Sequence, residues 1–114
     1  MTKKVLIHER VRKLEGGFSY VPHRFVTGGF MEALTRNELL LYLFLVLVCD
    51  RNGLSYYSYD RICTLLELCL DEYIEARNAL IKMDLIAFDG TLYQVLALPE
   101  TAPAIRSCKD SRYA

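Results

Sequence analysis

The chain has 114 residues and a mass of 13.1 kDa, which predicts a single domain. Hydrophobic residues account for 53% of it, which is enough to bury a core without the help of disulfide bonds or metal ions. The four cysteines form no C-x-x-C pair, and only His8 and His23 could add imidazole ligands, so neither a metal site nor a cofactor is expected. Reduced, mostly buried thiols in a cytoplasmic protein are the simplest interpretation.

Charge is distributed unevenly along the chain, although the net charge is zero. Residues 1–24 hold six Lys or Arg against two Glu, a balance of +4, whereas residues 25–98 hold five against ten acidic residues, a balance of −5. Residues 1–19 are interpreted as a basic arm, with no apolar segment typical of a secretory signal. The most apolar run, Leu39 to Cys49, has about half the length of a membrane-spanning helix, so it predicts a core helix and no membrane contact.

The first long helix is predicted after a segment that glycine and proline residues interrupt. Glycine pairs and Pro22 favour a short extended piece around residues 18–21, then a loop or short helix up to Leu34. Thr35-Arg36-Asn37-Glu38 matches a capping box, so a helix should run from there to about Cys49. This helix is apolar nearly all round, which is typical of a central helix covered on several sides.

A short strand and a second helix are predicted next. Residues 54–57 are rich in aromatics and favour a strand. Ser58 offers an N-cap for a helix from Tyr59 to about Leu66. Its predicted apolar face consists of Ile62, Leu65 and Leu66.

A third helix and a hairpin complete the predicted domain. A break at residues 67–70 leads into a helix that ends at about Met83. Strands at 85–88 and 91–98 flank Asp89-Gly90, a two-residue signal for a type I′ turn. Pro99 and Pro103 end the hairpin, so residues 99–114 are predicted to be a flexible tail.

This order of elements, together with particular residues, resembles a known family. The stretch SYDRICTLLELCLDEYIEARNALIKMDLI is similar to the S-x-x-x-I-A-x-x-L-G-x-S-x-x-T-V-x-x-A-L-x-x-L-x-x-x-G-L-I pattern of winged-helix regulators and of plasmid or phage replication initiators. The upstream VPHRFVTGGFMEALTRNELLLYLFLVLVCDRNG resembles the segment before it in initiators, so the similarity covers about residues 20–98. The chain departs from the pattern at Glu67, Cys69 and Asp84, where the family has Gly, a capping Ser and Gly.

The resemblance implies an α+β fold that is mainly α with a small β-hairpin. This is a winged helix-turn-helix domain over residues 20–98, with a three-helix core plus a wing. The resemblance implies DNA binding in transcription regulation or replication initiation, by a protein of a plasmid, phage or other mobile element that acts as a dimer. In the family frame, the third helix turns Tyr73, Ala76, Leu80 and the stem of Arg77 to the core, with Ile74 and Ile81 beside them. Its outward residues are Leu70, Asp71, Glu72, Glu75, Asn78, Ala79 and Lys82.

Candidate DNA contacts come from three segments. On the groove-facing third helix they are Asn78, which could pair with adenine, and Lys82. Before and within the second helix they are Tyr57, Ser58 and Arg61, for phosphate, although at least one of the neighbouring tyrosines is expected in the core. The basic arm could add a non-specific grip or merely solubilise the chain; its residues are Lys3, Lys4, Arg10, Arg12 and Lys13.

Two features of the same region disfavour DNA. Asp71, Glu72 and Glu75 repel phosphate, although acids in a first turn also complement the helix dipole. Residues 83–105 contain no Lys or Arg, so the wing lacks a cation to grip the DNA backbone. The alternative hypothesis is therefore a protein-interaction or dimerisation module on a winged-helix scaffold. With two histidines and no glycine-rich phosphate loop, neither an enzyme nor a small-molecule substrate is expected.

Overall fold

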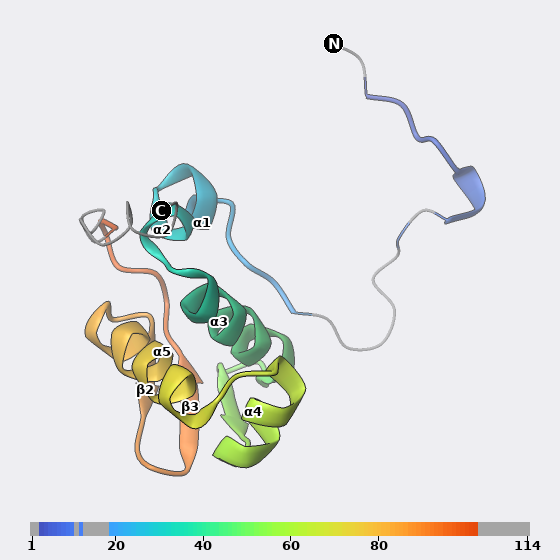
Figure 1. Cartoon of the computed structure of the whole chain (residues 1–114). Coiled ribbons are helices and arrows are strands. Elements are labelled where there is room, and N and C mark those ends of the chain that lie inside the picture. The colour runs from blue at the N-terminus through green and yellow to red at the C-terminus, as the bar shows by residue number, and fades with distance from the viewer. Residues whose placement is uncertain (1–2, 11, 13–18, 103–114) are drawn as a thin grey trace, which may run out of the picture.

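A computed structural model describes residues 3–10, 12 and 19–102 of the chain (Figure 1). Within them, five α-helices and a three-stranded antiparallel sheet form an α+β arrangement, as predicted. A single 3-10 turn, η1 (His8–Arg10), lies in the arm. The other elements are α1 (Arg24–Thr27), α2 (Phe30–Ala33), α3 (Arg36–Val48), β1 (Leu54–Tyr56), α4 (Tyr59–Leu66), α5 (Leu70–Lys82), β2 (Ile86–Phe88) and β3 (Leu92–Val95).

The predicted capping box at the start of α3 is confirmed. The Thr35 hydroxyl accepts a hydrogen bond from the Glu38 N–H at 3.3 Å, and the Glu38 carboxylate accepts from the Thr35 N–H at 3.0 Å. Leu41 and Leu45 on this helix are fully buried, where α3 packs against α5 and β3. The ring of Tyr42 stacks on Phe25 of α1 at 5.0 Å. Helix α3 is therefore the central helix of the core.

Helix α3 meets α1, α5 and β3, so it is covered on several sides as expected, but one outward side stays open. Leu40, Leu43 and Leu47 are 42%, 37% and 70% exposed. The surrounding described residues therefore leave at least a third of each of these leucines exposed. The apolar composition of the helix therefore exceeds what its own domain buries.

The predicted strand and second helix are present, with one correction. Strand β1 covers 54–56, and α4 begins directly after Ser58. Ile62 is fully buried and Leu66 half-buried, but Leu65 is 52% exposed. The face of this short helix that packs on α5 carries Ile62, Cys63 and Leu66, and Leu65 lies outside it.

Two residues with a left-handed backbone mark the ends of α4 and α5. Glu67 has φ 54° and Asp84 has φ 63°, at two positions where the winged-helix pattern has Gly. After Glu67, the chain turns through the buried Leu68 into α5. The Glu72 carboxylate accepts from the Cys69 N–H at 2.9 Å, which supplies the reciprocal half of a capping box. This hydrogen bond lowers the pKa of Glu72.

The sheet has the order β1-β3-β2, with β3 in the middle. Ser55 of β1 and Phe88 of β2 both lie opposite Tyr93. The predicted type I′ turn at Asp89-Gly90 is wrong, because such a turn needs positive φ at both residues, and only Gly90 has it, at 106°. The Asp89 carboxylate instead accepts from the N–H groups of the residues two and three positions on, at 2.9 and 2.7 Å.

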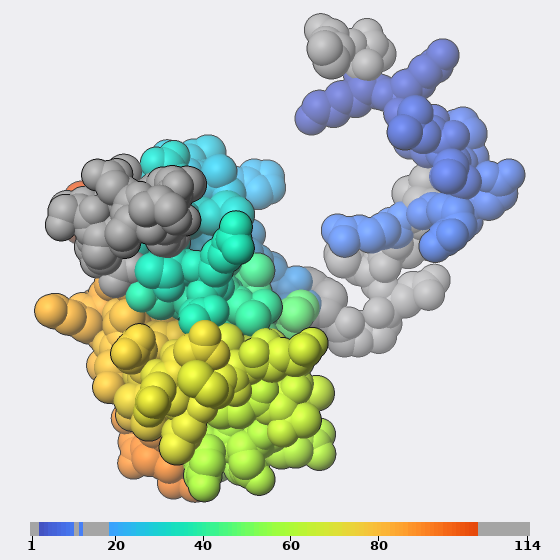
Figure 2. All heavy atoms as spheres, viewed as in Figure 1, coloured from blue at the N-terminus to red at the C-terminus, as the bar shows by residue number. Residues whose placement is uncertain are grey.

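The chain segments that flank the core differ in their attachment. The Arg24 guanidinium donates to the carbonyls of Leu98, Pro99 and Glu100 at 2.9, 2.8 and 3.2 Å, so the first residues of the predicted tail are fastened to α1. Residues 103–114 lie outside the described residues. Residues 3–10 of the arm are exposed and extend away from the helices (Figure 2); Lys13 lies outside the described residues.

Candidate nucleic-acid interface

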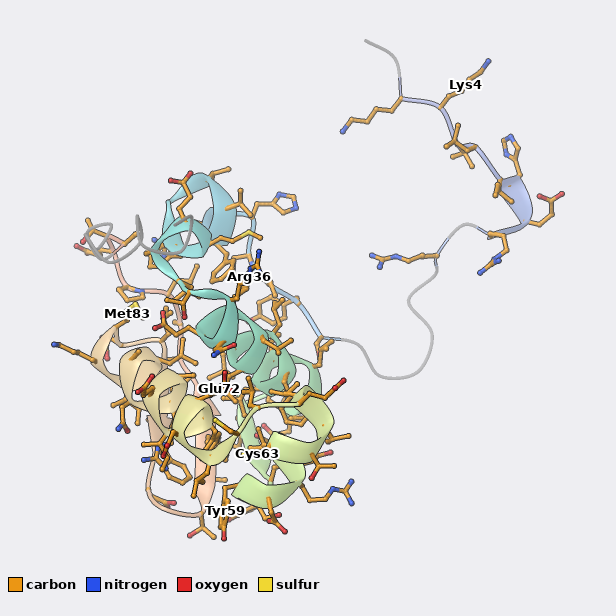
Figure 3. The ribbon with its side chains drawn as sticks, in the orientation of Figure 1. Lys4, Arg36, Tyr59, Cys63, Glu72 and Met83 are labelled. Carbon is orange, nitrogen blue, oxygen red and sulfur yellow. The ribbon has the colours of Figure 1, made fainter. Side chains whose placement is uncertain are left out.

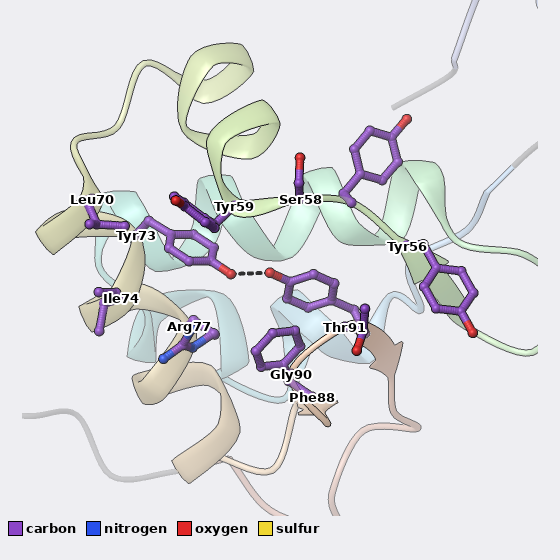
Figure 4. A pocket seen from close by; sticks show the side chains of 12 residues that line it. Tyr56, Ser58, Tyr59, Leu70, Tyr73, Ile74, Arg77, Phe88, Gly90 and Thr91 are labelled. Atoms are coloured by element: carbon purple, nitrogen blue, oxygen red, sulfur yellow. Dashed lines mark hydrogen bonds between the residues drawn. The ribbon is translucent and has the colours of Figure 1, made fainter.

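One face of the domain combines α4, α5 and the hairpin around a hollow of about 740 Å³ (Figure 4). We call it the aromatic hollow. It lies between the loop before α4, the first half of α5 and the tip of the hairpin. The side chains and backbone that line it belong to Tyr56, Tyr57, Ser58, Tyr59, Leu70, Tyr73, Ile74, Arg77, Phe88, Gly90, Thr91 and Tyr93.

The floor of the aromatic hollow is a fixed group of rings. The hydroxyls of Tyr73 and Tyr93 are hydrogen-bonded to each other, and both residues are 1% exposed. Burial, followed by this hydrogen bond, raises the pKa of Tyr93. The ring of Phe88 stacks on Tyr93 at 4.4 Å between centroids. These contacts fix α5 against β2 and β3.

Among the described residues that line the aromatic hollow, Arg77 is the only charged one. Its guanidinium carbon lies 5.4 Å from the ring centroid of Tyr73 and 5.2 Å from that of Phe88. Both distances are typical of cation–π contacts. Arg77 is half-buried, in agreement with the prediction that its stem faces the core.

The three predicted phosphate-binding residues near α4 have different surroundings. Tyr57 is half-buried, and its ring meets Phe44 edge-on at 5.1 Å. Ser58 and Arg61 are exposed. Among the tyrosines that line the aromatic hollow, the most exposed are instead Tyr56 and Tyr59, at 71% and 57%.

The N-terminus of α4 already carries a carboxylate. The pKa of Asp60 is lowered first by a hydrogen bond from the Ser58 hydroxyl, then by backbone N–H groups of the first turn. Ser58 therefore occupies the N-cap position without capping the helix through its side chain. A phosphate approaching here would meet the charge of Asp60, so contacts from Arg61, or from a Ser58 hydroxyl turned away from Asp60, would have to form at the side of the helix.

The outward face of α5 agrees with most of the sequence prediction. Tyr73, Ala76 and Leu80 are buried. Ala79, predicted to face outward, is half-buried, and Ile81, predicted to lie beside the core, is 38% exposed. The exposed positions are Leu70, Asp71, Glu72, Glu75, Asn78, Ile81 and Lys82.

The structure brings Asn78 and Lys82 together, one turn apart on α5. The Asn78 side-chain oxygen accepts two hydrogen bonds from the Arg77 guanidinium, at 3.2 and 3.3 Å. This contact fixes the orientation of the Asn78 amide and does not involve the nitrogen of that amide. Figure 3 marks Glu72 at the opposite end of α5, so the acids and Lys82 occupy different turns of the helix. The described arm residues Lys3, Lys4, Arg10 and Arg12 are exposed and separate from this face.

The sequence did not predict that Phe88 and Arg77 line the aromatic hollow. The neighbouring tyrosines were a visible signal, but the hairpin register that brings Phe88 beside them is a tertiary property. The cysteines also differ from expectation, because Cys49 and Cys63 are half-buried and Cys69 is exposed. Burial raises the pKa of the Cys63 thiol.

Among the described residues, no group of three or more His, Cys, Asp or Glu side chains is placed to hold a metal ion. None of the helices found there has the length and apolar character needed to cross a membrane. Comparison of the chain with protein-family models, curated proteins and solved structures gave no match. The case for a function therefore comes from the geometry of the chain itself.

Proposed function

We propose that residues 20–98 form a winged helix-turn-helix domain that binds double-stranded DNA, in a cytoplasmic regulatory or replication-initiator-like protein. The observation that carries the proposal is the arrangement of elements: α3, α4 and α5 are followed by a hairpin, and β1 joins that hairpin in the order β1-β3-β2. In such an arrangement the second helix of the turn enters the major groove. Helix α5 is the second helix in this order and would take that position, and its outward residues are exposed.

The proposed contacts follow from the exposed side chains. Asn78 and Lys82 would face base edges and the groove wall, because they lie on the outward side of α5. Arg61 and Ser58 would meet phosphate beside α4. The basic arm would add charge neutralisation that the −5 balance of residues 25–98 does not provide.

The charges on this face also set the expected strength of binding. Asp71, Glu72 and Glu75 are exposed on the first turns of α5, and each repels phosphate. We therefore expect DNA to approach the C-terminal half of α5, where Asn78 and Lys82 lie. Binding should be weak without the arm and steeply dependent on salt.

Fluorescence anisotropy of a labelled mixed-sequence duplex, titrated across a salt series, tests the proposal. Micromolar binding that weakens with salt is expected, and Lys82→Ala should lower the affinity and reduce the salt slope by about one. Arg51→Ala is the matched control, since Arg51 is an equally charged exposed residue in the turn after α3. Absence of binding at low salt, or equal losses in the two variants, would contradict the proposal.

A second candidate function is favoured by the aromatic hollow. A concave, mostly aromatic surface beside exposed acids suits a protein segment with an apolar anchor and basic flanks. Such a partner would make the domain an interaction module on the same scaffold. Failure of the duplex to bind, together with a Tyr59→Ala variant that loses a partner bound by the natural chain, would favour this function.

A further inference from the structure

The outward side of α3 carries a regular line of side chains. Arg36, Leu40, Leu43 and Leu47 of α3 follow one another at spacings of four, three and four residues, and Asp50 lies in the turn after the helix, which ends at Val48. All five are exposed. We call this line the leucine seam. It lies opposite the buried face formed by Leu41, Tyr42 and Leu45.

The spacing of the leucine seam matches that of a helix-pairing surface. A 4-3 repeat of apolar residues keeps one narrow stripe in line along a helix and lets it face a second helix over its whole length. Scattered exposed leucines are ordinary, whereas aligned ones form a continuous patch that is typical of an interface. Leu39 and Phe44, both half-buried, widen the stripe on its two sides.

The ends of the leucine seam carry opposite charges, and this selects the occupant. Arg36 lies seven residues before Leu43, about 10 Å along the helix at 1.5 Å per residue, and Asp50 lies in the turn beyond the other end of α3. We infer that a second copy of the chain covers the seam, with the two α3 helices antiparallel about a two-fold axis near Leu43. Arg36 of each copy would then meet Asp50 and the C-terminal carbonyls of α3 in the other.

The electrostatics favour the antiparallel pair over a parallel one. A parallel pair would place Arg36 against its own counterpart and align the two helix dipoles. The negative charge is also fixed in position, because the Asp50 carboxylate accepts from the N–H groups of Asn52 and Leu54 at 2.8 and 3.0 Å. Figure 3 marks Arg36 at the N-terminal end of α3.

The pairing does not depend on DNA binding. Helix α5 packs against the buried face of α3, so the leucine seam and the outward face of α5 lie on different sides of the domain. A dimer formed through α3 would leave both α5 faces open. Loss of DNA binding and loss of dimerisation can therefore be distinguished by separate measurements.

Sedimentation velocity of the full chain over a concentration series tests the inference. The natural chain should move from 13.1 kDa toward twice that mass. Leu43→Asp should raise the dissociation constant at least about 30-fold, as for a central interface residue. Leu65→Asp on α4 is the matched control, because Leu65 is an exposed leucine outside the seam, and it should leave the constant unchanged.

The charge at the end of the leucine seam provides a second test. Arg36→Glu should weaken the dimer about tenfold at low salt and less at high salt, because it replaces an attraction with a repulsion. Asp50 is left intact, since its carboxylate also holds the turn after α3. Circular dichroism checks that each variant is folded. A chain that stays monomeric at high concentration, or a dimer equally stable in Leu43→Asp, would overturn the inference.

Discussion

Helices α3 and α5 have much in common and present opposite surfaces. Each has 13 residues, carries at its third position a glutamate that accepts a hydrogen bond from the N-cap N–H, and packs against the other in the core. Yet the outward line of α3 is leucine, whereas that of α5 begins with acids and ends with Asn78 and Lys82. The same local rules of capping and burial therefore build both helices, and only the outward side chains distinguish them.

The difference indicates two separate roles. A leucine line is unfavourable in water and is stabilised by another apolar surface. A polar and charged face is stable in water and can select a partner by its charge pattern. We therefore expect α3 to join copies of the chain and α5 to meet the functional target.

The largest expected effect contrasts the two sides of α3 itself. Leu45→Ala should lower the free energy of unfolding by about 2–5 kcal/mol, because Leu45 is fully buried and its truncation leaves a cavity. Leu47→Ala, at a 70% exposed position, should cost less than about 0.5 kcal/mol in the monomer. Urea unfolding at a concentration below dimerisation measures both. Similar losses would show that the outward side of α3 is buried.

The next effect concerns the contact that fixes α5 to the sheet. Tyr73→Phe leaves the buried Tyr93 hydroxyl without its partner, which should cost about 1–3 kcal/mol. Removal of both hydroxyls, in Tyr73→Phe with Tyr93→Phe, should cost less than the sum of the single changes. Thermal and urea unfolding of the three variants test this coupling, and strictly additive losses would contradict it.

The N-caps of α3 and α5 should contribute different amounts to the free energy of unfolding. Thr35→Ala should lower the free energy of unfolding by about 1 kcal/mol, because the hydroxyl accepts from the Glu38 N–H. A thiol is a weaker acceptor than a hydroxyl, so Cys69→Ser should stabilise the chain by a few tenths of a kcal/mol up to about 1 kcal/mol. Urea unfolding compares the pair, and a destabilised Cys69→Ser would show that the thiol has another role.

The smallest expected effect is the pH dependence of the α5 cap. Because its hydrogen bond lowers the pKa of Glu72, this carboxylate adds stability at neutral pH. That contribution begins to fall as the pH drops through the ordinary glutamate value of about 4.3 and is lost below the lowered pKa. The stability gap between the natural chain and Glu72→Gln should therefore narrow on acidification. A constant gap across this range would contradict the assignment.

Much of the fold could be predicted from local signals in the sequence. The Thr35–Glu38 box, the turn at Glu67 and the apolar spacing of α5 each depend on residues a few positions apart, so they are visible in the sequence. The exact hairpin turn was missed because the side chain of Asp89 binds two backbone N–H groups and leaves only Gly90 with positive φ. The choice between this turn and a type I′ turn depends on the register of the two strands.

The candidate site was less accessible to sequence reasoning. The outward residues of α5 follow from helical periodicity, and Asn78 and Lys82 lie where it predicts. The position of Arg77 over two rings, and the meeting of Phe88 with the tyrosines before α4, depend on how the hairpin packs on α5. The exposure of Leu40, Leu43 and Leu47 was hidden for the same reason, since composition alone does not show which side of a helix its neighbours leave open.

The proposed DNA interface is tested most directly by mapping it residue by residue. Backbone amide chemical shifts of the full chain should be recorded by NMR during titration with a short duplex at low salt. We predict the largest changes at Ser58, Arg61, Asn78 and Lys82, with smaller changes in the arm. Changes confined to residues 3–12, with α4 and α5 unaffected at saturation, would contradict DNA binding by the helix-turn-helix.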